Sequence, residues 1–205
     1  GGPTGIAAAY FLGRAGIETT IFERERCLGG VPRHVIPSFR IANETIEKDI
    51  ALMQKYDVEV KCGAPAPSVE ELKKLGYTHI LFAVGAWKPG KLDIPGDVAG
   101  AIQWMKGVKA GNIAVGGNVV VVGGGNTAMD AARLAKRSGA KNVTLVYRRT
   151  KKYMPADEHE LALALADGVT FAELCAPVEQ KDGVLRCEKM KLGEADASGR
   201  RSPVA

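Results

Sequence analysis

The chain has 205 residues, of which 46% are hydrophobic and 25% charged, and it carries a formal net charge of +5. This balance is typical of a folded globular protein and excludes a disordered chain. No apolar run approaches the roughly 18 residues that a membrane-spanning helix needs, and no basic stretch followed by an apolar one marks a signal peptide, so we expect a cytoplasmic protein without a membrane partner.

The first half of the chain alternates helices with short strands, which predicts a parallel sheet with helices on its faces. Apolar residues recur at helical spacing over residues 43–56, with Asn43 as the expected N-cap. Ser68 and Glu71 have the spacing of a capping box at a helix start. We expect helices over residues 4–15, 43–56 and 68–75, strands over 19–22, 58–60 and 79–84, and a loop over 24–41.

Turn-forming residues gather over residues 87–100 and include Lys88-Pro89-Gly90 and Ile94-Pro95-Gly96. They predict a boundary between a first domain, residues 1–97, and a second, residues 98–205. Strand and helix alternate again in the second domain, as in a further β-α-β unit. We expect helices over residues 101–110, 126–138 and 156–166, strands over 118–122, 142–147, 169–172, 176–179 and 184–190, a turn at Asp182-Gly183, and a loop over 193–205.

The second domain carries a G-x-G-x-x-A motif at residues 123–128, between a valine strand that we expect to be buried and a helix. In that context the motif is typical of a dinucleotide-binding turn. Gly123 permits the tight turn, Gly125 leaves room for a pyrophosphate, and Ala128 lets the helix pack closely on the sheet. The helix N-terminus offers N–H groups and a partial positive charge to phosphates. A glycine-rich turn without a ligand is the alternative.

The end of the next strand predicts which nicotinamide cofactor binds. An acidic residue there would hold the ribose 2′-OH of NAD, whereas arginine accommodates the 2′-phosphate of NADP. Here the strand ends in Arg148 and Arg149, whose guanidinium groups suit a phosphate, so we expect NADPH. A solvated surface pair is the alternative. No acidic residue lies between Asp130 and Asp157, and with few aromatics nearby this basic stretch favours a small anionic ligand over nucleic acid.

A second, incomplete glycine motif opens the chain. Gly2 and Gly5 match the second and third glycines of a dinucleotide turn, and Glu23 stands where the ribose-binding carboxylate belongs. The first glycine and its strand would precede residue 1, so this domain looks like a fragment. A carboxylate at that position favours FAD, whose adenosine ribose is free. The alternative is a helix start with a chance glycine pair.

The cysteines and histidines give no metal-binding pattern. Four cysteines lie far apart without a C-x-x-C pair, and the three histidines are equally scattered. We interpret the cysteines as ordinary thiols in a reducing compartment and expect no metal site in this chain.

Over nearly its whole length the chain resembles the small subunit of glutamate synthase. Related FAD and NADPH modules occur in selenate-reductase-like proteins and in dihydropyrimidine dehydrogenase. The resemblance lies in the order of these segments: Gly2 to Gly5, Glu23 with Gly29-Gly30, Ile36-Pro37-Ser38-Phe39-Arg40, Ala83-Val84-Gly85-Ala86, Ile94-Pro95-Gly96, Gly123 to Asp130, and Tyr147-Arg148-Arg149-Thr150 with Met154-Pro155-Ala156.

The resemblance implies an α/β flavoprotein with two Rossmann-like dinucleotide-binding domains and parallel sheets, the FAD domain being incomplete at both ends. NADPH would pass hydride to FAD, and electrons would leave through an iron–sulfur domain or a larger catalytic subunit. The flavin does the chemistry, so no side chain need be catalytic. The alternative function is a non-catalytic NADPH-binding module used for sensing or assembly. The implied FAD contacts are Gly2, Gly5, Glu23, Gly30 and Gly85, and the implied NADPH contacts are Gly123, Gly125, Asn126, Thr127, Arg148 and Arg149.

The sequence departs from the family pattern in two places. Val35 stands where the family usually carries a glycine near the flavin. The family's iron–sulfur cysteines and the later glycine motif that closes the FAD domain are not in this sequence.

Overall fold

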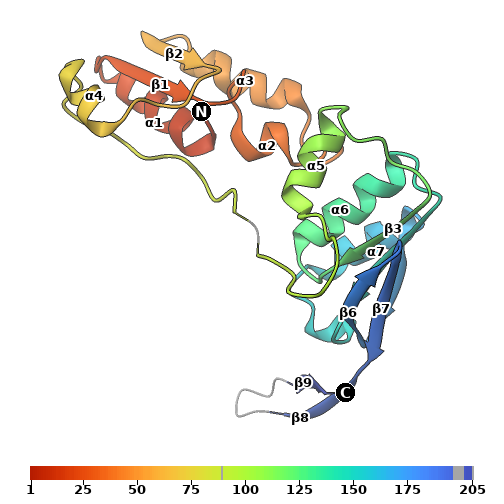
Figure 1. Cartoon of the computed structure of the whole chain (residues 1–205). Helices are drawn as coiled ribbons and strands as arrows, with labels where there is room; N and C mark the ends of the chain where they lie inside the picture. Colours follow the sequence, from red (N-terminus) through yellow and green to blue (C-terminus); the bar gives the residue numbers. More distant parts are fainter. Residues whose placement is uncertain (89, 196–200, 205) are drawn as a thin grey trace. The chain divides into compact units, whose positions relative to one another are not determined.

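The computed structural model describes residues 1–88, 90–195 and 201–204 (Figure 1). They form two compact units, Gly1–Lys88 and Pro89–Ala205. The boundary falls inside the turn-rich stretch over residues 87–100; the division at 97 and 98 into an FAD and an NADPH domain stays a prediction. Among the described residues, no helix is long and apolar enough to cross a membrane.

The first unit contains a two-stranded parallel sheet and four helices. Ile6 and Ala9 of the first helix, Ile21 of the first strand and Met53 of the third helix meet in one buried cluster. Apolar residues of both long helices thus share one core with the first strand, and the third helix packs chiefly against the first. The elements are α1 (Pro3–Arg14), β1 (Thr19–Glu23), α2 (Gly30–His34), α3 (Asn43–Met53), β2 (Val58–Cys62) and α4 (Val69–Lys74).

Three details of the first unit correct the sequence predictions. Helix α2 lies inside the expected loop over residues 24–41. Ala42, not Asn43, is the N-cap of α3; its carbonyl accepts from the Thr45 N–H, so Asn43 is already helical. The expected strand over residues 79–84 is not formed, because a strand needs a hydrogen-bonding neighbour and no described strand pairs with this segment.

The second unit is built on a three-stranded parallel sheet in the order β3-β4-β5, which β3 (Asn118–Val122), β4 (Asn142–Tyr147) and β5 (Thr170–Glu173) form. Met129, Val143, Leu145 and Ala164 lie in its core, to which α6 and α7 contribute. In Figure 1, α5 lies beside α6, with which it is in contact. The helices are α5 (Ala101–Lys109), α6 (Asn126–Arg137), the 3-10 helix η1 (Lys151–Tyr153) and α7 (Glu158–Ala166).

Strand β3 is less buried than its four valines predict. Val120 is 47% exposed, and Val119 and Val121 are only half-buried. The reason is position: β3 ends the strand order of its sheet and, among the described strands, pairs with β4 alone. The expectation of a fully buried strand was therefore wrong, while its bounds were right.

Two antiparallel hairpins follow the parallel sheet. The first joins β6 (Cys175–Lys181) and β7 (Val184–Lys189) through Asp182 and Gly183, both at positive φ, as a two-residue hairpin turn requires. The second pairs β8 (Lys191–Ala195) with β9 (Arg201–Val204). Strands therefore replace part of the loop expected over residues 193–205, whose residues 196–200 and 205 lie outside the described ones. Parallel sheets flanked by helices confirm the α/β, Rossmann-like fold class in both units.

Candidate dinucleotide-binding sites

The glycine loop of the second unit is pinned at both ends by backbone hydrogen bonds. Gly123, at φ +145°, donates its N–H to the Val146 carbonyl at 3.0 Å. The Gly124 carbonyl accepts from the Ala156 N–H, also at 3.0 Å. The loop is thereby fixed to the end of β4 and to the segment before α7.

Gly124 and Gly125 have different surroundings. A Cβ on Gly124 would lie 2.5 Å from Cε2 of Tyr147, a buried side chain whose hydroxyl donates to the Tyr153 carbonyl at 2.7 Å. A Cβ on Gly125 would have Pro155 Cγ at 3.9 Å as its nearest neighbour, which is ordinary contact, and Gly125 has extended backbone at φ −98°. The positive φ of Gly123 and the Tyr147 ring beside Gly124 therefore require glycine at both positions, while a Cβ at position 125 would meet only ordinary contact.

Helix α6 begins directly behind this opening. Gly125 is its N-cap, and the Gly125 carbonyl accepts from the N–H groups of Ala128 and Met129. Asn126 and Thr127 are exposed and occupy the first two helical positions, whose N–H groups have no acceptor within a helix. The first turn contains no acidic residue, so the partial positive charge of the helix end is not neutralised there.

The two arginines after β4 differ from one another. Arg148 is exposed, whereas Arg149 is 9% exposed and its Nε has no hydrogen-bond partner among the described residues. A buried donor without an acceptor costs on the order of 1–3 kcal/mol. An anionic group accepting from Arg149 would remove that cost. The glycine loop follows the carboxyl end of β3, and Arg149 follows the carboxyl end of the neighbouring parallel strand β4. The structure therefore fits a phosphate at this edge of the sheet.

Other basic residues of this stretch hold the fold together. Asp167, at the end of α7, accepts from Arg133 Nε at 2.8 Å and from Arg137 at 2.7 Å. Hydrogen bonding from Arg137, with that from Arg133, lowers the pKa of the Asp167 carboxyl from 3.8 to about 2 although its burial opposes the shift. Lys136 donates to the Lys141 carbonyl. These three cations thus stabilise α6, and Arg148 and Arg149 are the ligand candidates that the sequence predicts.

The first unit brings its predicted glycines together. Gly2 is the N-cap of α1, and Gly29 donates its N–H to the Gly1 carbonyl at 2.7 Å. Gly30 has φ +56°, and a Cβ there would lie 2.7 Å from the Cα of Gly2. Backbone packs on backbone, so a side chain at Gly30 would push α2 away from the start of α1.

Glu23 ends β1 beside this glycine contact. Its carboxylate is mostly buried, with Oε2 lying 3.0 Å from the Gly1 nitrogen and Oε1 accepting from the Glu25 N–H at 2.9 Å. The side chain is thus held at the position where a ribose hydroxyl would meet it in a dinucleotide turn. Gly30 therefore lies against Gly2, and Glu23 lies against the neighbouring Gly1. Their contacts with FAD stay a prediction.

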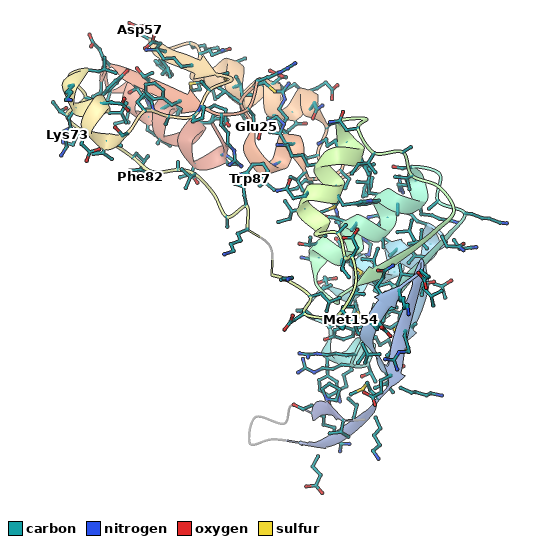
Figure 2. All side chains as sticks on the ribbon, in the orientation of Figure 1. Glu25, Asp57, Lys73, Phe82, Trp87 and Met154 are labelled. Carbon is teal, nitrogen blue, oxygen red and sulfur yellow. The ribbon has the colours of Figure 1, made fainter. Side chains whose placement is uncertain are left out.

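Gly5 and Gly85 belong to the same neighbourhood more loosely. A Cβ on Gly5 would lie 3.7 Å from the Cβ of Ala83. Gly85, at φ +70°, follows in the same segment, two residues before Trp87, which is labelled in Figure 2. The centroid of the Trp87 ring lies 5.0 Å from the guanidinium carbon of Arg24. Contacts at both Ala83 and Trp87 therefore place the Gly85 segment along the α1 start and the β1 end.

The sequence did not predict two residues that support the glycine loop. One departure from the family pattern, Val35, has a structural role. Tyr147 and Ala156 were not predicted as supports of the glycine loop, because only the folded chain brings them to it. Val35 is 2% exposed and so belongs to the buried interior of the first unit. No group of three or more histidine, cysteine, aspartate or glutamate side chains is placed to hold a metal ion in the described part of the chain.

Comparison with known proteins identifies relatives along the whole chain. The chain is 43% identical to the putative oxidoreductase YgfK of Escherichia coli (strain K12), over 99% of this chain and 20% of that protein. It is 33% identical to the glutamate synthase [NADPH] small chain of Azospirillum brasilense, over 98% of this chain and 47% of the relative. The chain thus spans between a fifth and a half of these curated relatives.

Solved structures show the same fold. Mycobacterium tuberculosis FprA in complex with NADPH superposes with a TM-score of 0.72 and 17% identity, covering 99% of this chain and 65% of FprA. The sequence model of the pyridine nucleotide-disulphide oxidoreductases matches residues 1–184. With two glycine turns, each beside the end of a parallel strand, the chain belongs to the pyridine nucleotide-disulphide oxidoreductase family.

Proposed function

We propose that this chain is the electron-entry part of a larger flavoprotein oxidoreductase, in which the second unit binds NADPH and the first binds FAD. The proposal is carried by two features of the second unit that the fold itself does not explain. A Cβ at position 125 would meet only ordinary contact, so the fold does not explain the glycine there, and the buried Arg149 Nε has no partner among the described residues. A pyrophosphate at the first and a 2′-phosphate at the second account for both features.

The residues proposed for NADPH bind and orient the cofactor. Backbone N–H groups of Asn126 and Thr127 would hold the pyrophosphate, since they stand at the N-terminus of α6. Arg148 and Arg149 would hold the 2′-phosphate through charge-assisted hydrogen bonds. An NADPH-complexed relative of the same fold, FprA, supports this assignment.

The first unit fits FAD through a carboxylate and a glycine contact. Glu23 would accept from the free adenosine ribose, and glycine at position 30 allows its backbone to lie close to Gly2 at the start of α1. When bound, FAD supplies the redox chemistry by taking up hydride from NADPH. The contacts of Gly5 and Gly85 with FAD are part of the same proposal.

The electrons would leave to a partner. The Azospirillum relative is named a small chain, which implies a larger companion, so we propose an iron–sulfur domain or a larger catalytic subunit as the acceptor. We also propose a cytoplasmic location, because a reducing compartment suits the four free cysteines.

The double variant Arg148→Ser/Arg149→Ser tests the NADPH site. We expect NADPH binding, measured by isothermal titration calorimetry, to weaken about tenfold or more, since a lost charged hydrogen bond costs roughly 1.5–3 kcal/mol. NADH binding should stay unchanged. The matched control is Lys151→Ser/Lys152→Ser, which removes the same charge nearby and should cost far less. Equal losses for NADPH and NADH in the arginine variant would contradict the assignment.

A second measurement separates the enzyme from a binding module. We expect the flavin-loaded protein to lose its yellow absorbance when NADPH is added without oxygen. An NADPH-binding protein whose flavin stays oxidised would instead be a sensing or assembly module.

A further inference from the structure

The segment that carries the two arginines, residues 148–151, is held from the neighbouring strand by two hydrogen bonds. The Arg149 carbonyl accepts from the Leu174 N–H at 3.2 Å, and the Lys151 N–H donates to Glu173 Oε2 at 2.9 Å. Glu173 is the last residue of β5, which pairs with β4 in parallel, so these groups meet where the two strands end. Two consecutive residues after β5 thus hold the arginine segment at two points.

Leu174 has a strained backbone conformation at this corner. Its φ of +56° lies in the left-handed region, which residues other than glycine seldom adopt. Its N–H donates to Arg149, while its carbonyl accepts from the Met190 N–H at 2.8 Å. Strain of this kind persists only where the surrounding structure fixes it, so the corner between β5 and β6 is a firm support for the arginine segment.

The Glu173 carboxylate gives the first N–H of η1 an acceptor from another element. Thr150, the N-cap of η1, makes no side-chain capping bond, and the Lys151 N–H donates to Glu173 instead. At the other end of η1 the Tyr153 carbonyl accepts from the Tyr147 hydroxyl. Glu173 therefore fixes the chain directly after the two arginines.

The charge of Glu173 is unfavourable beside a phosphate site. Two negative groups repel one another, so by charge alone the removal of this carboxylate would strengthen the binding of a nearby phosphate. Loss of its hydrogen bond to the Lys151 backbone would instead release the arginine segment and weaken that binding. The two effects have opposite signs, so an experiment can tell them apart.

We propose that Glu173 is a positioning residue for NADPH specificity. Its carboxylate holds the Lys151 N–H and thereby keeps Arg148 and Arg149 where the 2′-phosphate binds. The proposal rests on the NADPH assignment of the second unit and adds to it a residue from a neighbouring strand. Glu173 acts through the arginines without contacting the cofactor, so its contribution concerns the 2′-phosphate and not NADH.

Two substitutions of Glu173 separate its hydrogen bond from its charge. Glu173→Ala loses the acceptor, and we expect NADPH and 2′,5′-ADP binding, measured by isothermal titration calorimetry, to weaken about fivefold while NADH binding stays unchanged. Glu173→Gln keeps an acceptor oxygen without the charge, so it should bind NADPH at least as tightly as the unsubstituted chain. Glu188→Ala is the matched control: it removes an equal charge from an exposed position of β7 and should change binding by less than about twofold.

A proline at position 151 tests the donor. Lys151 is the first residue of η1 and Thr150 before it has extended backbone, so proline fits there and removes the N–H. In the Lys151→Pro background we expect Glu173→Ala to have no further effect on NADPH binding, because its partner is already absent. In the matched Lys151→Ser background, which keeps the N–H, the loss should persist. An undiminished loss in the proline background would overturn the proposal.

The outcomes separate this inference from the proposed function. Suppose that the unsubstituted chain prefers NADPH to NADH. If Glu173→Ala then leaves NADPH binding unchanged, strengthens it, or weakens NADH binding equally, the positioning role is overturned and the NADPH assignment stands. The same holds if Glu173→Gln loses as much as Glu173→Ala.

If the unsubstituted chain binds NADPH no more tightly than NADH, both are overturned. A loss confined to NADPH and 2′,5′-ADP in Glu173→Ala, restored in Glu173→Gln and with circular dichroism unchanged, supports the proposal.

Discussion

The ring of Tyr147 occupies the space that any side chain at Gly124 would need: a Cβ there would lie 2.5 Å from Tyr147 Cε2. The Tyr147 hydroxyl is in turn held by the Tyr153 carbonyl at 2.7 Å. The Tyr147 side chain, two residues before the buried Arg149, therefore limits how closely the glycine loop can pack on the end of β4.

Substitution of the two neighbouring glycines should separate folding from binding. We expect Gly124→Ala to lower the free energy of unfolding by about 1–3 kcal/mol, the usual cost of overpacking. Gly125→Ala meets only ordinary contact, at 3.9 Å from Pro155, and should leave stability within about 0.5 kcal/mol while weakening NADPH binding. Urea denaturation and calorimetric titration measure the two effects. A Gly125→Ala protein that binds NADPH normally would argue against pyrophosphate approach at this position.

The glycine contact of the first unit gives a second prediction. Gly30→Ala should destabilise this unit by more than Gly63→Ala does. Both glycines have positive φ and share a strain of about 1–2 kcal/mol, but only at Gly30 does the new Cβ meet backbone, at 2.7 Å from Gly2 Cα, whereas nothing lies within 4 Å at Gly63. Thermal unfolding compares the pair. Equal losses of stability would show that the Gly2–Gly30 approach is relaxed easily.

The segment before α5 is docked on β6 through Gly96. A Cβ on Gly96 would collide with the Gln180 carbonyl, and Gln180 donates its N–H to the Pro95 carbonyl at 2.9 Å. We expect Gly96→Ala to detach this segment and to increase hydrogen exchange at the Gln180 amide tenfold or more. Gly116→Ala, with nothing within 4 Å, is the control and should leave that exchange unchanged. Unaltered Gln180 protection in Gly96→Ala would contradict the docking.

Asp167 should make the second unit sensitive to acid. Its pKa is lowered from 3.8 to about 2, chiefly by Arg137, so the ionised carboxylate stabilises the folded state. This contribution, about 2 kcal/mol at most for a partly exposed side chain, is complete above pH 3.8 and is lost as the pH falls through about 2.

The Asp167→Asn variant checks that prediction. At pH 7 it should unfold at lower urea concentration than the unsubstituted chain, and the difference should shrink as the pH falls below 3.8 towards 2. A difference that is independent of pH over this range would assign the effect to packing rather than to the charge.

Sequence patterns predicted those elements whose causes are local. The Ser68–Glu71 capping box forms as expected, with Ser68 Oγ accepting from the Glu71 N–H. The N-cap at Asn43 failed because the preceding turn already supplies the Ala42 carbonyl to the helix. The strand at residues 79–84 failed for a different reason: Leu81, Phe82 and Val84 are 64%, 70% and 73% exposed, and pairing depends on a neighbour that composition does not reveal.

At the candidate sites, too, the sequence predicted local features but not those that depend on packing. Motif spacing predicted a tight turn at Gly123 and a strand that ends at Glu23, because backbone conformation and strand ends follow from the fold class. The cofactor contacts of Gly123, Gly125 and Glu23 stay predictions. Motif spacing could not distinguish Arg148 from Arg149, since burial depends on the packing of β4 against β5. Nor could it find the Arg24–Trp87 stack, whose members lie more than sixty residues apart in the sequence.

The unequal burial of the two arginines also suggests how cofactor preference in this lineage could change. Arg148 is exposed, so under the proposed assignment a substitution there would weaken the contact with the 2′-phosphate at little cost to folding. Arg149 is enclosed by the protein, and its replacement changes packing as well as charge. An evolutionary or engineered route from NADPH towards NADH would therefore begin at position 148 and reach position 149 only after its surroundings had adapted.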